Sequence, residues 1–102
     1  MVLLCGGKGE RLRPLTNQIP KPLIEIKGKA IISYQLEYFK KIGISRYIIA
    51  TGYKTDKFQV FFRNYEKDVE IEIIDSGNVD IIKRIKDSSS RLNSDFLVCY
   101  GD

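Results

Sequence analysis

Glycines and cations gather in the segment that follows the first apolar run. Residues 6–13 read Gly-Gly-Lys-Gly-Glu-Arg-Leu-Arg. Glycine lets a backbone approach a ligand closely and present its N–H groups to phosphate oxygens. Glu10 is the one acidic residue in this stretch. The basic residues in or shortly after it are Lys8, Arg11, Arg13 and Lys21. Together, the glycines and cations predict a site for a polyphosphate.

Two common phosphate-binding motifs do not fit this stretch. The dinucleotide fingerprint G-x-G-x-x-G would need a glycine where Leu12 stands. A P-loop would need Gly-Lys-Ser/Thr where residues 9–11 read Gly-Glu-Arg. Lys21 lies between two prolines, which restrict the backbone on both sides. That triplet alone leaves two interpretations open: an ammonium aimed into the site, or a rigid surface turn with a solvated lysine.

A second candidate is the carboxylate of Asp102, which follows the last apolar run. Mg²⁺ binds in proteins through one or two carboxylates together with substrate phosphates. A Gly-Asp pair at a strand end is otherwise a routine turn. The residues by themselves therefore leave both interpretations of Gly101-Asp102 open.

The elements that must position these residues alternate between strands and helices, which is typical of an α/β fold around a parallel sheet. Glutamates alternate with apolar residues in the third strand, so we expect that strand at an edge, whereas the first and fourth are apolar throughout. Right-handed crossovers then favour a doubly wound sheet with the spatial order 3-2-1-4. The expected strands are Val2–Cys5, Tyr47–Thr51, Val69–Ile74 and Phe96–Tyr100.

Helical spacing occurs twice between these strands. Ile32, Leu36 and Phe39 recur along one face, and Gly43 supplies a stop signal. The aromatic residues in the segment 58–65 follow the spacing i, i+3, i+4 and i+7, which indicates core packing rather than a stacking platform for bases. Ser88-Ser89-Ser90 is interpreted as a loop.

Composition limits the class of protein. The chain has 102 residues, which suits one module, and its 17 basic residues are mixed with 13 acidic ones, so a nucleic-acid-binding domain is disfavoured. The longest apolar runs have about five residues, far fewer than a membrane helix needs, and no secretory signal is recognisable, so we expect a cytoplasmic protein without a membrane span. Cys5 and Cys99 end apolar runs, and we expect reduced, inert thiols on neighbouring strands.

The segments 4–16 and 20–23 resemble the signature of the sugar-1-phosphate nucleotidyltransferases. Gly28-Lys29, Gly43-Ile44 and Gly52-Tyr53 match the same family at later positions, so the resemblance covers nearly the whole chain. It implies a Rossmann-like nucleotidyltransferase fold. It also implies a transferase of sugar-nucleotide biosynthesis, which joins a sugar 1-phosphate to a nucleoside triphosphate and releases pyrophosphate.

The resemblance also assigns roles to individual residues. Arg11 would hold the triphosphate and the leaving pyrophosphate, Lys21 would contact the reacting phosphates, and Asp102 would bind Mg²⁺. Arg11 and Lys21 are thus the expected catalytic residues. The residues expected to bind the nucleotide are Leu4, Gly6, Gly7, Gly9, Arg11 and Lys21.

The segments 74–79 and 99–102 look more like the glucose-1-phosphate cytidylyltransferase branch, so CTP is the first choice of nucleotide. We interpret residues 1–102 as the N-terminal nucleotide-binding part of a truncated nucleotidyltransferase domain that forms a homo-oligomer. The family places a second metal-binding acid and most sugar contacts further along, so we expect this chain alone to bind nucleotide weakly without turnover. A non-catalytic nucleotide- or sugar-nucleotide-binding regulatory module is the alternative.

Overall fold

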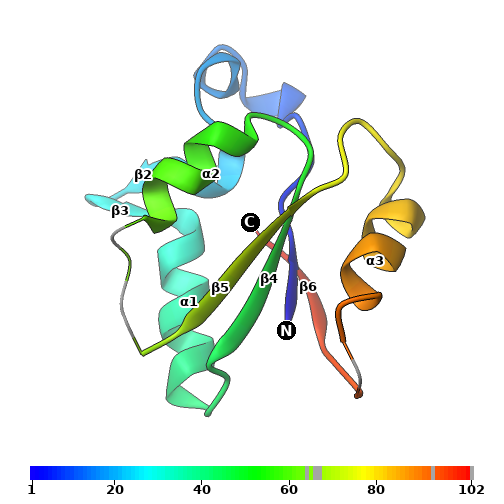
Figure 1. The fold of residues 1–102 in the computed structure, drawn as a ribbon. Helices are drawn as coiled ribbons and strands as arrows, with labels where there is room; N and C mark the ends of the chain where they lie inside the picture. Colours follow the sequence, from blue (N-terminus) through cyan, green and yellow to red (C-terminus); the bar gives the residue numbers. More distant parts are fainter. Residues whose placement is uncertain (64, 66–67, 93, 102) are drawn as a thin grey trace.

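The computed structural model describes residues 1–63, 65, 68–92 and 94–101. In this part of the chain, four parallel strands form one sheet in the order β5-β4-β1-β6 (Figure 1). This confirms the predicted α/β class, the order 3-2-1-4 and the edge position of the third predicted strand. The strands are β1 (Val2–Leu4), β4 (Arg46–Thr51), β5 (Glu70–Asp75) and β6 (Val98–Tyr100).

Helices cover both faces of this sheet. In Figure 1, α1 (Ile31–Lys41) and α2 (Thr55–Phe62) lie on one side of the strands, and α3 (Ile81–Ser89) lies on the other. Successive side chains of a strand point to opposite faces, so β1 contributes to two cores. Leu3 belongs to the core under α1 and α2, whereas Val2 belongs to the core on the α3 side. Because both faces of β1 are buried, all of its residues must be apolar.

The helices α1 and α2 form where helical spacing predicted them. Leu36 is buried on α1, and Gly43 follows the helix with a φ of 95° that suits glycine. On α2, Phe58 is fully buried, and the aromatic residues that follow it pack against the same core. These contacts confirm that the aromatic stripe is core packing. Tyr65 belongs to this core but lies beyond the helix, because α2 ends at Phe62.

The interpretation of Ser88-Ser89-Ser90 as a loop was wrong, because Ser88 and Ser89 are the last residues of α3. The Asp80 carboxylate begins this helix by accepting a hydrogen bond from the Lys83 backbone N–H at 2.8 Å. Lys83 also bonds through its ammonium to Asp87 one turn later, and this hydrogen bond lowers the pKa of the Asp87 carboxyl. Local capping and pairing thus contribute to the stability of α3.

The connection between β1 and α1 is more regular than a plain loop. It contains three single 3-10 turns, at Glu10–Leu12, Leu15–Asn17 and Lys21–Leu23. A short antiparallel pair of β2 (Glu25–Ile26) and β3 (Lys29–Ala30) follows them and leads into α1. The basic segment is consequently folded back on itself.

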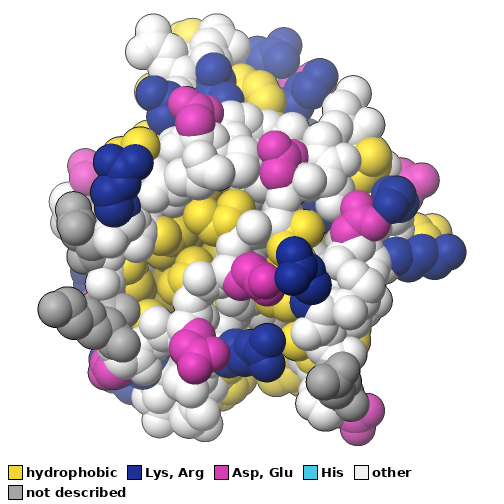
Figure 2. Space-filling view, in the orientation of Figure 1, with side chains coloured by type: hydrophobic (Ala, Val, Ile, Leu, Met, Phe, Trp, Pro, Cys, Tyr) yellow, Lys and Arg dark blue, Asp and Glu magenta, His cyan; other side chains and the backbone are white. Residues whose placement is uncertain are grey.

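The two outer strands of the sheet differ in character. β5 carries charged side chains on its outer face, where Glu70 pairs with Arg46 and Glu72 with Arg91. Figure 2 shows the molecule from the side seen in Figure 1: apolar side chains lie in the middle of this surface, and acidic and basic side chains surround them. On β6, by contrast, Tyr100 is 62% exposed. The side chains of Val98 and Tyr100 on β6 are thus open to solvent.

None of the helices in the described ranges has the length and apolar character needed to cross a bilayer.

Candidate functional site

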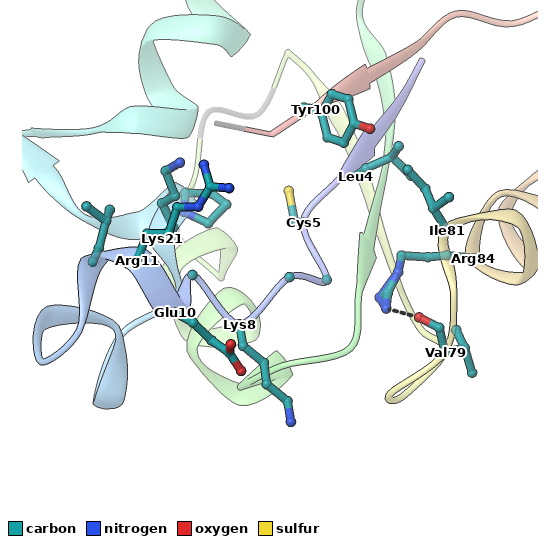
Figure 3. Close-up of a pocket in the computed structure, with 15 residues that line it drawn as sticks. Leu4, Cys5, Lys8, Glu10, Arg11, Lys21, Val79, Ile81, Arg84 and Tyr100 are labelled. Carbon is teal, nitrogen blue, oxygen red and sulfur yellow. Dashed lines mark hydrogen bonds between the residues drawn. The ribbon is translucent and has the colours of Figure 1, made fainter.

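A pocket of about 640 Å³ lies at the carboxyl ends of β1 and β6. In doubly wound folds, ligands bind at this end of the sheet, where the strand order reverses. Figure 3 shows how the lining side chains surround the space beyond Leu4. They come from the turn after β1, the turn of Lys21, the start of α3 and the end of β6. The lining residues are Leu4, Cys5, Gly6, Gly7, Lys8, Gly9, Glu10, Arg11, Leu12, Lys21, Pro22, Val79, Ile81, Arg84 and Tyr100.

The three glycines of the loop meet three different requirements. No described atom lies within 4 Å of the place where a Cβ of Gly7 would be, so its backbone faces open space. Gly9 has a φ of 60°, and a Cβ there would lie 2.7 Å from Cγ2 of Thr16. The Cβ position of Gly6 is taken by the guanidinium of Arg84, whose Nη1 lies 1.5 Å away from it. Of the three, Gly7 is thus the exposed glycine whose Cβ position is open.

Two hydroxyl groups fix the far end of this loop. The Thr16 hydroxyl donates to the carbonyl oxygen of Gly9 at 2.6 Å. The Tyr53 hydroxyl, from the segment after β4, donates to the carbonyl oxygen of Thr16 at 2.6 Å. Thr16 is fully buried, so these hydrogen bonds are shielded from water. The glycine loop is thereby tied to the body of the sheet.

The four cations predicted to act together are divided by the structure. Lys8, Arg11 and Lys21 line the pocket, whereas Arg13 does not. Arg13 instead lies 3.7 Å from the carboxylate of Glu10, measured from Nη2 to Oε1. Within the described ranges, Arg11 forms no ion pair. Arg11 is thus the arginine of this loop that is available to an anion in the pocket.

Lys21 is held by the turn that surrounds it. Pro20 and Pro22 are buried, and the Pro20 carbonyl oxygen accepts a hydrogen bond from the Leu23 N–H at 2.9 Å. This rigid turn places Lys21 in the pocket wall, which favours the first of the two interpretations of the triplet. In Figure 3, Lys21 and Arg11 lie across the pocket from Arg84. One wall of the pocket is consequently cationic.

The opposite wall was largely missed by sequence reasoning. Val79 and Ile81 provide apolar surface there, and Arg84 adds a buried guanidinium. All three belong to α3 or to the turn before it, and the sequence analysis assigned no helix to this segment. The signal that could have found them is Asp80, a capping residue directly before two isoleucines.

The expected metal ligand, Asp102, lies outside the described residues. In the part of the chain that the structure describes, no three His, Cys, Asp or Glu side chains come together in a way that could hold a metal ion. Glu10 is the acidic residue that lines the pocket, and Arg13 pairs with it. The described residues therefore do not make a metal centre by themselves.

The chain belongs to the nucleotidyl transferase family, since that family's model matches residues 1–93. Curated relatives agree. The chain is 36% identical over 102 residues to the bifunctional protein GlmU of Methanocaldococcus jannaschii, a match over 99% of this chain and 24% of that protein. It is 43% identical over 65 residues to a probable glucose-1-phosphate cytidylyltransferase of Bacillus subtilis, a match over 64% of this chain and 26% of that protein. The chain thus spans about a quarter of the length of these relatives.

Solved structures share the fold as well. The structure of HddC from Yersinia pseudotuberculosis complexed with GMP-PN superposes with a TM-score of 0.87 at 28% identity. The match covers 99% of this chain and 46% of that one. The fold of this chain is therefore shared with about half of that structure.

Proposed function

We propose that this protein acts in the transfer of a nucleotidyl group from a nucleoside triphosphate to a sugar 1-phosphate, with release of pyrophosphate. The observation that carries the proposal is the cationic wall formed by Arg11 and Lys21 beside the open backbone of Gly7. An exposed glycine in a pocket that two cations also line suits the oxygens of a triphosphate. In this proposal, Leu4, Gly6 and Gly9 shape the remainder of the nucleotide site.

The proposed chemistry needs charge neutralisation more than proton transfer. A phosphate oxygen of the sugar 1-phosphate attacks the α-phosphorus, a new P–O bond forms, and the bond to the pyrophosphate oxygen breaks. The attacking oxygen is already ionised at neutral pH, so no general base is required. Arg11 and Lys21 would stabilise the charge that develops on the transferred and leaving phosphates. The sequence contains no histidine, which agrees with this division of roles.

We propose that Mg²⁺ binds together with the triphosphate and that Asp102 is its protein ligand. Mg²⁺ is commonly held by one or two carboxylates plus substrate phosphates. When bound, the ion would neutralise phosphate charge. Because Asp102 lies outside the described residues, every other part of the proposal is assigned to the side chains of the pocket.

CTP is the proposed nucleotide, on the likeness of segments 74–79 and 99–102 to the cytidylyltransferase branch. The B. subtilis relative supports this choice, although a mannose-1-phosphate guanyltransferase of Saccharomyces cerevisiae is also 32% identical over 107 residues. We further propose that residues 1–102 form the nucleotide-binding part of the transferase, in the cytoplasm and as a homo-oligomer. Exposed apolar side chains of β6, such as Tyr100, support the last point.

A thermal-shift panel tests the proposal. Purified protein is heated with CTP, dTTP, UTP, GTP or ATP in the presence of Mg²⁺, because a ligand that binds only the folded state raises the melting temperature. CTP should give the largest increase. Pyrophosphate release is then measured with each stabilising nucleotide and a set of sugar 1-phosphates.

The outcomes of these two measurements separate the candidate functions. Sugar-dependent release of pyrophosphate supports the transferase. Binding of a nucleotide or nucleoside-diphosphate sugar by the complete enzyme, without any release, supports the non-catalytic regulatory module instead. A protein whose melting temperature no nucleotide changes would contradict both.

A further inference from the structure

Arg84 is a buried cation in the pocket wall that lies opposite Arg11 and Lys21. Its residue surface is 7% exposed, and within the described ranges no carboxylate pairs with its guanidinium. Burying a charge without an opposite charge is costly unless hydrogen bonds satisfy it. The acceptors are three backbone carbonyl groups: those of Thr51 at 3.3 Å, Gly77 at 3.3 Å and Val79 at 3.0 Å.

These acceptors belong to separate segments of the chain. Thr51 is the last residue of β4, whereas Gly77 and Val79 lie in the turn between β5 and α3. The guanidinium also lies against Gly6, which follows β1. One side chain of α3 therefore contacts the carboxyl ends of three strands at the place where the pocket opens.

Two glycines make room for this guanidinium. A Cβ on Gly6 would lie 1.5 Å from Nη1 of Arg84. A Cβ on Gly52 would lie 2.5 Å from the same atom and 2.2 Å from the carbonyl oxygen of Gly77. Neither Gly6 nor Gly52 has a positive φ among the described residues, so neither needs to be glycine for its backbone conformation. A glycine at position 6 leaves the space that the Arg84 guanidinium fills.

We propose that Arg84 is a positioning residue that sets the depth of the glycine loop, residues 6–9, in the nucleotide pocket. This inference rests on the proposed function. The planar guanidinium packs against Gly6, and its N–H groups donate to the carbonyl oxygens of Gly77 and Val79 in the neighbouring turn. These contacts fix the position of Gly7 relative to the bound phosphates. A lysine would supply the charge but not the planar fork, which donates in several fixed directions.

Kinetic constants distinguish positioning from general stabilisation. Arg84→Lys and Arg84→Met should each raise the KM for the nucleoside triphosphate, and its Kd, by about tenfold or more through loss of the charge-assisted hydrogen bonds. The KM for the sugar 1-phosphate should change by less than about threefold, because in this proposal Arg84 acts through the glycine loop that binds the nucleotide. Lys86→Met, an exposed cation on the same helix, is the matched control and should change neither value.

A double-mutant cycle tests the contact itself. Gly6→Ala in the parent should weaken nucleotide binding by about tenfold or more, because the new methyl group displaces the guanidinium. In the Arg84→Ala background that space is vacant, so adding Gly6→Ala should cost less than about threefold further. Thermal unfolding and circular dichroism establish that each variant is folded, and the KM and Kd values of Arg84→Lys and Arg84→Met test the proposal if the alanine variant is not.

Each result bears on a definite claim. Additive losses for Gly6→Ala and Arg84→Ala, or Arg84 variants that bind nucleotide like the parent, would overturn the positioning role and leave the transferase proposal intact. Equal increases in KM for nucleotide and sugar would also overturn it, since they indicate a general loss of structure. A parent protein that binds no nucleotide would remove both claims.

Discussion

Replacing Arg11 with alanine removes an arginine that lines the pocket and forms no ion pair in the described part of the chain. If Arg11 stabilises the charge of the leaving pyrophosphate, its role is comparable to that of a transition-state arginine in phosphoryl transfer. Losing such an arginine reduces the rate by about 10³ or more. This corresponds to about 4 kcal/mol of transition-state stabilisation.

Arg13 provides the internal control, because it lies two residues away and carries the same charge. Its guanidinium lies 3.7 Å from the Glu10 carboxylate, and the two side chains are 48% and 67% exposed. An exposed pair of this kind contributes about 0–1 kcal/mol. Arg13→Ala should therefore lower the rate by less than about fivefold.

The assay is pyrophosphate release by the complete enzyme with Mg²⁺, the preferred nucleoside triphosphate and its sugar 1-phosphate. Thermal unfolding of both variants, each compared with the parent, separates a lost contact from a lost fold. Equal losses for Arg11→Ala and Arg13→Ala would refute the reasoning, because they would mean that net charge near the pocket matters and the position of Arg11 does not. An Arg11→Ala variant with full activity would refute it as well.

Three further predictions concern the fold. Phe58→Ala should lower the free energy of unfolding by about 3–5 kcal/mol in denaturant titrations, since Phe58 is fully buried; a loss near zero would contradict its place in the core. Gly9→Ala should destabilise by about 1–2 kcal/mol because of its φ of 60°, whereas Gly7→Ala should leave stability unchanged and weaken nucleotide binding. In the native protein, a thiol reagent should modify the half-buried Cys99 first and reach Cys5 only on unfolding; simultaneous reaction of both thiols would show that the β1 end is open.

The sheet could be predicted because its signal is repeated along the chain. An apolar run such as Val2–Leu4 must be covered on both faces, and the glutamates of Glu70–Asp75 must face water. These two facts place β1 inside and β5 at an edge. Helical spacing and a following glycine likewise located α1. The neighbouring positions of Cys5 and Cys99, close to β1 and on β6 and without a disulfide, followed from the same order.

The helix α3 could not be found in this way, because its buried positions are polar. Arg84 and Ser88 lie one turn apart and face the interior, so apolar periodicity fails where they stand. A pattern based on hydrophobicity predicts that an arginine lies at the surface, so it gives the wrong prediction for the buried Arg84. Its partners are backbone carbonyl groups, which leave no trace in the order of side chains.

Only part of the candidate site could be predicted, because the sequence does not show which side chains contact each other. Spacing located the glycines and cations, but it gave no means of separating Arg11 from Arg13, since both precede the same turn. Their separation depends on which side chain Glu10 engages. In the same way, a sequence shows that Gly6 and Gly9 are glycines but not that one serves for space and the other for its backbone angle.

The central place of β1 also has a consequence for the order in which the chain folds. Val2 pairs with Ile48 on one side and with Val98 on the other, so both partners are synthesised long after it. Pairing across such long loops is slow, because the loop must close before the contact is gained. We therefore expect the end of β1 and the glycine loop to become ordered only after β4, and fully after β6. A nucleotide bound there would hold together the strands that meet last, and pulse-labelling hydrogen exchange during refolding should find the amide of Cys5, which donates to Ala50, among the late protected groups.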